Sequence, residues 1–71
     1  MKATFIIDEY VAVLPLIQNL YTPEQEGLGW TWGFKYTSGV FEYFHVTSEN
    51  EARRQCDALI EAIDAYWENK A

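Results

Sequence analysis

Residues 48–70 read SENEARRQCDALIEAIDAYWENK and carry the clearest helical pattern in the chain. Their apolar side chains recur at spacings of three and four, which places them on one face of an α-helix. Ser48 and Glu51 form the S-x-x-E pattern of a capping box, so we expect the helix to begin here. The predicted apolar stripe consists of Ala52, Cys56, Leu59, Ile63 and Trp67, flanked by Ile60 and Tyr66.

Two β regions are predicted upstream of this helix. Residues 3–7, ATFII, are rich in β-branched and aromatic side chains and predict a strand. Residues 30–46 predict a hairpin, because aromatic residues alternate with small or polar ones along its first half. Residues 22–29, TPEQEGLG, contain proline and glycine between these regions and predict an acidic loop, the best candidate for a mobile segment.

The register of the hairpin depends on the length of its turn. A three-residue turn that ends at Gly39 pairs Trp32 with Phe44. A two-residue turn would instead set Lys35 against Glu42, an attractive charge pair. We favour the three-residue turn, because it leaves one strongly apolar face and one amphipathic face.

Residues 8–21, DEYVAVLPLIQNLY, are compatible with more than one structure. Helical spacing of the apolar residues, with Asp8 as N-cap, favours a helix. Against this, Pro15 inside a helix costs ~3 kcal/mol or kinks it, and valines prefer strands. The first strand could therefore run on through Val13, or a helix could begin late with Pro15 at its first position. We favour a helix that is bent or begins near Leu14.

The predicted order of elements is β-α-β-β-α. We expect an α+β fold, in which helices pack on one face of a mostly antiparallel three-stranded sheet and the other face stays open. Residues 1–71 are too few for two domains, so a single domain is predicted. A chain of this size buries only a small core. Its 17% aromatic content offsets the small core size, since each ring buries a large area.

Charge and cysteine content restrict the function classes. The net charge is −6 and the isoelectric point is near 4.4, which disfavours binding to nucleic acid or anionic membranes and favours a basic partner. Cys56 is the single cysteine and cannot form an internal disulfide, which indicates a reducing cytosol. No leader pattern and no apolar run long enough to span a bilayer is visible. We therefore expect a cytoplasmic protein.

A row of carboxylates lies on the predicted helix face opposite the apolar stripe. Its spacings of four, three and four align the side chains, and like charges so spaced repel by about 0.2–0.5 kcal/mol per pair. The helix dipole disfavours anions near the carbonyl end, and the only nearby arginines, Arg53 and Arg54, lie close to one member of the row. This acidic row is Asp57, Glu61, Asp64 and Glu68. We predict that it contacts a basic protein surface; a plain solvated helix face is the alternative.

Catalytic, metal and cofactor sites are not predicted. His45 and Cys56 lie on separate elements, and neither has the partner that an activated nucleophile needs. The spacings of a structural metal site and of a phosphate-binding glycine loop are missing from the sequence. Phe41 and Tyr43 on the open sheet face are better candidates for a protein contact, since aromatic side chains anchor interfaces.

The overall character of the chain resembles the small anti-CRISPR and other anti-defence proteins of bacteriophages. The resemblance lies in the MKATFII start, the acidic helix DALIEAIDAYWE, the small acidic α+β chain and the lack of an active-site motif. It implies inhibition in the host cytosol by occupying a basic nucleic-acid-binding surface of a defence complex, such as a CRISPR effector subunit, sometimes described as DNA mimicry. No functional residue is transferred from that family.

Two functions are therefore expected. The first is a non-enzymatic protein-binding inhibitor that uses the acidic row, together with Glu24 and Glu26, against a basic partner surface. The second is a small accessory or regulatory subunit that docks, or homodimerises, through Phe41 and Tyr43. The sequence favours a monomer and no direct contact with nucleic acid or membrane.

Overall fold

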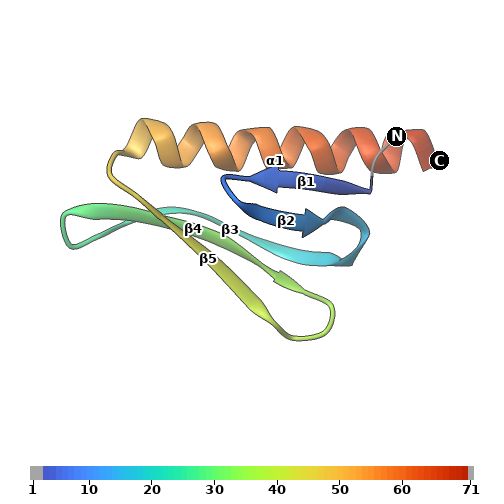
Figure 1. Ribbon diagram of the computed structural model, residues 1–71, viewed down its shortest axis with the longest axis horizontal. Coiled ribbons are helices and arrows are strands. Elements are labelled where there is room, and N and C mark those ends of the chain that lie inside the picture. The colour runs from blue at the N-terminus through green and yellow to red at the C-terminus, as the bar shows by residue number, and fades with distance from the viewer. Residues whose placement is uncertain (1–2, 71) are drawn as a thin grey trace.

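The chain folds into an α+β domain in which one long helix lies along a set of antiparallel strands (Figure 1). The computed structural model describes the backbone of residues 3–70 and the side chains of residues 3–69. The elements are β1 (Thr4–Ile7), β2 (Tyr10–Val13), a short 3-10 helix (Leu14–Leu16), β3 (Ile17–Glu26), β4 (Gly29–Tyr36), β5 (Phe41–Val46) and α1 (Glu49–Lys70).

The strands form two sheets. β3, β4 and β5 make a three-stranded antiparallel sheet in that order, and β1 and β2 form a separate antiparallel hairpin. The predicted three-stranded antiparallel sheet is confirmed, but its third strand is β3 and not residues 3–7. The predicted three-residue turn is also confirmed: Trp32 pairs with Phe44, and Gly39 has a φ of 93°, a backbone conformation that glycine adopts without strain.

The helix predicted within residues 8–21 is wrong. Asp8 has a φ of 54° in a tight turn, and the chain reverses there into β2. Pro15 then lies in the first turn of the 3-10 helix, which lasts three residues before β3 begins. The proline therefore ends one sheet and starts the next. The alternative of a late helix with Pro15 at its first position is realised only as this single turn.

The predicted loop at residues 22–29 is mostly strand. β3 continues to Glu26, and the chain turns back at Gly27, which has a φ of 62°. The ladder between β3 and β4 is irregular between Tyr21 and Glu24. Pro23 lies in this irregularity, where its lack of a backbone N–H costs no ladder hydrogen bond. Pro23 and the glutamates after it therefore lie in an irregular strand, where the sequence pattern had predicted a loop.

α1 begins where the capping pattern predicts, because the Ser48 hydroxyl accepts a hydrogen bond of 3.2 Å from the backbone N–H of Glu51. The first three residues of the predicted stripe, Ala52, Cys56 and Leu59, are fully buried. The stripe is wrong at its far end: Tyr66 is buried, whereas Trp67 is 51% exposed.

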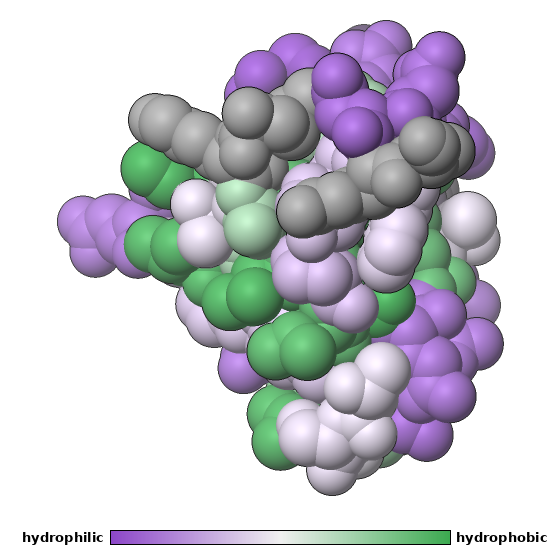
Figure 2. Space-filling model, turned by 90° about the vertical axis from the view of Figure 1, so that its right-hand side faces the viewer, coloured by the Kyte–Doolittle hydropathy of each residue, from purple (hydrophilic) through white to green (hydrophobic). Residues whose placement is uncertain are grey.

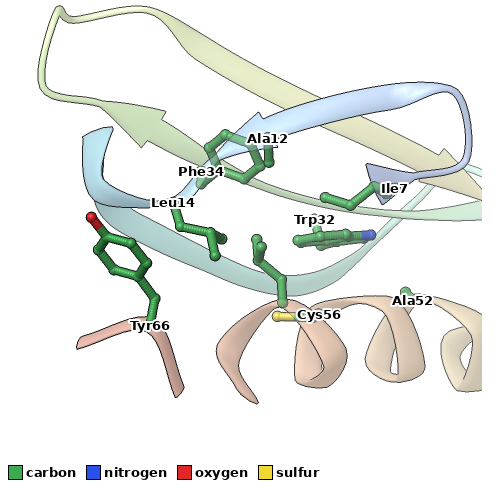
Figure 3. Close-up of a cluster of buried hydrophobic side chains, with 9 residues drawn as sticks. Ile7, Ala12, Leu14, Trp32, Phe34, Ala52, Cys56 and Tyr66 are labelled. Carbon is green, nitrogen blue, oxygen red and sulfur yellow. The ribbon is translucent and has the colours of Figure 1, made fainter. Parts of the chain in front are cut away.

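The core lies between α1, the β1–β2 hairpin and the inner face of the three-stranded sheet (Figure 3). Trp32 and Phe34 of β4 are its largest fully buried side chains, and Trp32 Nε1 donates a hydrogen bond of 2.9 Å to Gln55 of α1. The Tyr10 ring of β2 packs against Phe34, with 6.2 Å between ring centroids. The β1–β2 hairpin therefore covers the part of the sheet that the first predicted helix was expected to cover.

Candidate protein-binding surfaces

The acidic row lies on the outer face of α1, and all four of its residues are exposed. The helix packs on the core through Ala52, Cys56 and Leu59, and the helical repeat places the row on the other side. Helix α1 lies above the strands in Figure 1, and the surface at the top of the space-filling view in Figure 2 is mostly hydrophilic, with more apolar surface beneath it. The predicted row is thus directed away from the rest of the fold.

The arginines of α1 do not neutralise this row. Arg53 forms an ion pair of 2.7 Å with Glu49, and Arg54 pairs with Glu51. The pairing with Glu51 raises the pKa of the Arg54 guanidinium. Within residues 3–69, no side chain forms an ion pair or hydrogen bond with any carboxylate of the row. Both arginines lie about one helical turn before Asp57 and pair with earlier glutamates. The four neighbouring carboxylates of the row therefore face solvent.

Two apolar side chains border the acidic row. Ile60 is 37% exposed and Trp67 is 51% exposed, two helical turns apart on the side of α1 between the row and the core. The Trp67 ring packs edge-on against Tyr66, with 5.2 Å between centroids. Tryptophan is prominent among the residues that dominate binding energy at interfaces. The sequence assigned Trp67 to the core because its spacing fits the stripe equally well.

The outer face of the three-stranded sheet carries an exposed aromatic cluster, which consists of Tyr21, Phe41 and Tyr43. Their exposed fractions are 36%, 48% and 53%, respectively. The three ring centroids lie 6.0–6.3 Å apart, and the ring planes are within 24° of parallel. The sequence predicted Phe41 and Tyr43 on this face but missed Tyr21, because it placed that residue in a helix. A prediction of a strand from residue 17 onward would have placed Tyr21 on this face.

Gly33 of β4 makes room for this cluster. A Cβ atom at Gly33 would lie 2.9 Å from Cδ1 of Tyr43 and 2.2 Å from the backbone oxygen of Glu42. Both distances are shorter than van der Waals contact, so the close approach of β4 and β5 depends on a residue without a side chain. Gly33 therefore has a packing role that its place in the alternating strand pattern did not indicate.

An open groove of about 630 Å³ lies next to the aromatic cluster. It is lined by Tyr21 and Tyr43 and by polar side chains of β3, β4 and β5, chiefly Glu24, Glu26, Thr31 and His45. Thr31 Oγ1 donates a hydrogen bond of 3.2 Å to Glu26 and lies 2.9 Å from Nδ1 of His45. The Thr31 hydroxyl therefore lies between Glu26 and His45 and contacts both side chains. This chain of contacts fixes the polar end of the groove.

The structure therefore divides the predicted binding residues between two faces. Glu24 and Glu26 lie on β3, beside Tyr43 and close to Phe41 on the outer face of the sheet. The acidic row is on the outer face of α1, across the core from them. The core therefore separates Glu24 and Glu26 from the acidic row, and the use of both groups against one basic partner surface stays a prediction.

The two residues with nucleophile or base chemistry are not brought together. Cys56 is buried, and burial, together with the Asp57 charge, raises the pKa of its thiol. His45 is exposed on the open sheet face. No group of three or more His, Cys, Asp or Glu side chains within the described part of the chain has the arrangement of a metal site. Over the same residues, no helix is both long and apolar enough to cross a membrane.

Comparisons with protein-family models, with curated proteins and with solved structures returned no match for this chain.

Proposed function

We propose that this protein is a non-enzymatic protein-binding inhibitor whose acidic row covers a basic, nucleic-acid-binding surface on a partner complex. The observation that supports this function is the exposed row of Asp57, Glu61, Asp64 and Glu68, which lacks a cationic partner among the described side chains. In the anti-CRISPR-like form of the proposal, the protein is phage-derived, acts in the host cytosol and binds a CRISPR effector subunit.

The energetics of the row support a partner of opposite charge. Each pair of neighbouring carboxylates repels by about 0.2–0.5 kcal/mol, and no cation among the described side chains pairs with the row to offset this repulsion. A basic surface would offset it on binding and would also be drawn to the row at long range. Trp67 and Ile60 lie beside the row and supply the apolar contact that charge alone does not give.

The experiment is a capture assay with the tagged full-length protein in bacterial lysate that contains a CRISPR effector complex. We expect capture at low salt and loss of the complex as salt rises, because exposed charge pairs are screened. Glu61→Lys should abolish capture. Glu9→Lys is the matched control, since it makes the same charge change at an exposed position outside α1, in the turn between β1 and β2. Capture that is insensitive to salt and to Glu61→Lys would contradict the proposal.

A second candidate function is a small accessory or regulatory subunit that docks, or homodimerises, through the outer face of the sheet. The observation that favours it is the exposed aromatic cluster, since three adjacent rings are rarely left in solvent without a partner. Binding of this kind resists salt and fails in the Phe41→Ala and Tyr43→Ala variants. Light scattering over a range of protein concentrations separates a homodimer from a complex with another protein.

A further inference from the structure

The groove on the outer face of the sheet combines aromatic rings with negative charge. Tyr21 and Tyr43 supply the aromatic part of its lining, and Glu24 and Glu26 supply carboxylates. Glu24 has no hydrogen-bond or ion-pair partner among the described side chains, and Glu26 accepts one hydrogen bond from Thr31. None of the described residues that line the groove is a lysine or an arginine. The groove therefore has an unbalanced negative charge next to exposed π faces.

The aromatic cluster already holds one cation of the chain itself. The Lys35 ammonium lies 5.6 Å from the centroid of the Phe41 ring, a cation–π distance. This contact uses the Phe41 end of the cluster. Tyr21 and Tyr43 form the other end, next to the groove, and no cation–π contact occupies their rings within the described residues.

We propose that this groove binds an arginine side chain from an extended segment of a partner protein. A guanidinium is planar and weakly hydrated, so it stacks on an aromatic face and donates hydrogen bonds to carboxylates at the same time. The tyrosines and the two glutamates provide both kinds of contact. A groove of about 630 Å³ exceeds the volume of one side chain and accommodates the flanking backbone as well.

This inference rests on the second candidate function, because it names the chemistry of the partner that the outer sheet face accepts. It is independent of the acidic row, which lies on α1. An arginine segment is favoured over a purely apolar partner by charge complementarity: the protein carries a net charge of −6, and two of its carboxylates lie in the groove.

The test is an NMR titration of the isotope-labelled full-length protein with the peptide acetyl-Gly-Arg-Gly-Arg-Gly-amide. We expect saturable shifts at the amides of Tyr21, Glu24, Thr31 and Tyr43. The matching lysine peptide should bind more weakly, because an ammonium does not stack as a plane. The citrulline peptide has nearly the same shape without the charge and should produce no saturable shift at these amides.

Variants assign the binding to the groove. Glu24→Gln and Tyr21→Leu should each weaken binding of the arginine peptide about two- to fivefold, which is the range for one exposed charge or cation–π contact. Glu9→Gln removes the same charge from the turn between β1 and β2, outside both proposed binding surfaces, and is the matched control, so it should leave the affinity unchanged. The spectrum of each variant also reports whether it is folded, so that loss of binding is separated from unfolding.

Three outcomes would overturn the inference. Equal binding of the citrulline peptide would show that the groove does not recognise the arginine charge. The second candidate function would then remain as docking through apolar contacts. Chemical-shift changes along α1, or a lower affinity in Glu61→Gln, would show that the peptide binds at the acidic row and not in the groove. Shifts of the groove amides with protein concentration alone would show that a second copy of the chain occupies the groove.

Discussion

Removal of the acidic row should make the isolated protein more stable. The variant Asp57→Asn/Glu61→Gln/Asp64→Asn/Glu68→Gln abolishes three repulsive neighbour pairs, each about 0.2–0.5 kcal/mol. It also removes the Glu68 charge from the last turn of α1, where the helix dipole disfavours an anion by about 0.3–1 kcal/mol. No stabilising partner is lost among residues 3–69, because the arginines pair elsewhere. The expected gain is therefore about 1–2.5 kcal/mol at low salt.

Urea unfolding followed by tryptophan fluorescence measures this gain, since Trp32 is fully buried. The difference between variant and wild type should shrink in 1 M salt, where the Debye length falls to about 3 Å. The control Glu49→Gln/Glu51→Gln lies on the same helix but breaks both ion pairs at its amide end, so it should destabilise the protein. A row variant that is less stable than wild type would refute the claim that the row is uncompensated.

Four further predictions concern the sheet and the core. Gly33→Ala should cost about 1–3 kcal/mol in urea unfolding, because its Cβ would lie 2.2 Å from the backbone oxygen of Glu42; an unchanged midpoint would contradict this close approach. Tyr10→Phe removes the 2.8 Å hydrogen bond to the Tyr36 hydroxyl and should cost about 0.5–1.5 kcal/mol. Burial and that hydrogen bond raise the pKa of Tyr10 above its usual value of 10.0, so the tyrosine deprotonates in the unfolded state before it does so in the folded state. The free energy of unfolding should therefore fall as the pH rises above 10, and it should fall less steeply in Tyr10→Phe. Cys56 should react slowly with a thiol reagent until urea unfolds the chain, since burial raises its pKa; rapid labelling of the folded protein would show that the thiol is accessible.

Local patterns predicted the second half of the chain well. The capping residues and apolar spacing of α1 act over a few residues, and so does the Gly39 turn that sets the hairpin register. These signals do not depend on distant parts of the fold. The acidic row was predictable for the same reason, because a helix alone determines which side chains share a face.

The first half of the chain depends on contacts that local patterns do not contain. Residues 10–21 have both helical spacing and β-branched residues, and the choice was made by Pro15, by the pairing of β2 with β1 and by the pairing of β3 with β4. The β4 partners of residues 17–21 lie 12–19 residues later in the chain. The error also hid Tyr21, which reaches the aromatic cluster only when β3 is a strand. Trp67 shows a smaller ambiguity, since Tyr66 and Trp67 both follow the apolar stripe and packing against the sheet selects one of them.

We propose that the acidic row disables a basic surface of a partner complex. The most direct measurement is the plaquing efficiency of a CRISPR-targeted phage on bacteria that carry the matching CRISPR system and express this protein. We expect the wild-type chain and Glu9→Lys to restore plaquing, whereas Glu61→Lys/Asp64→Lys, expressed to the same level, should not. Full restoration of plaquing by Glu61→Lys/Asp64→Lys would show that the acidic row is not the inhibitory surface.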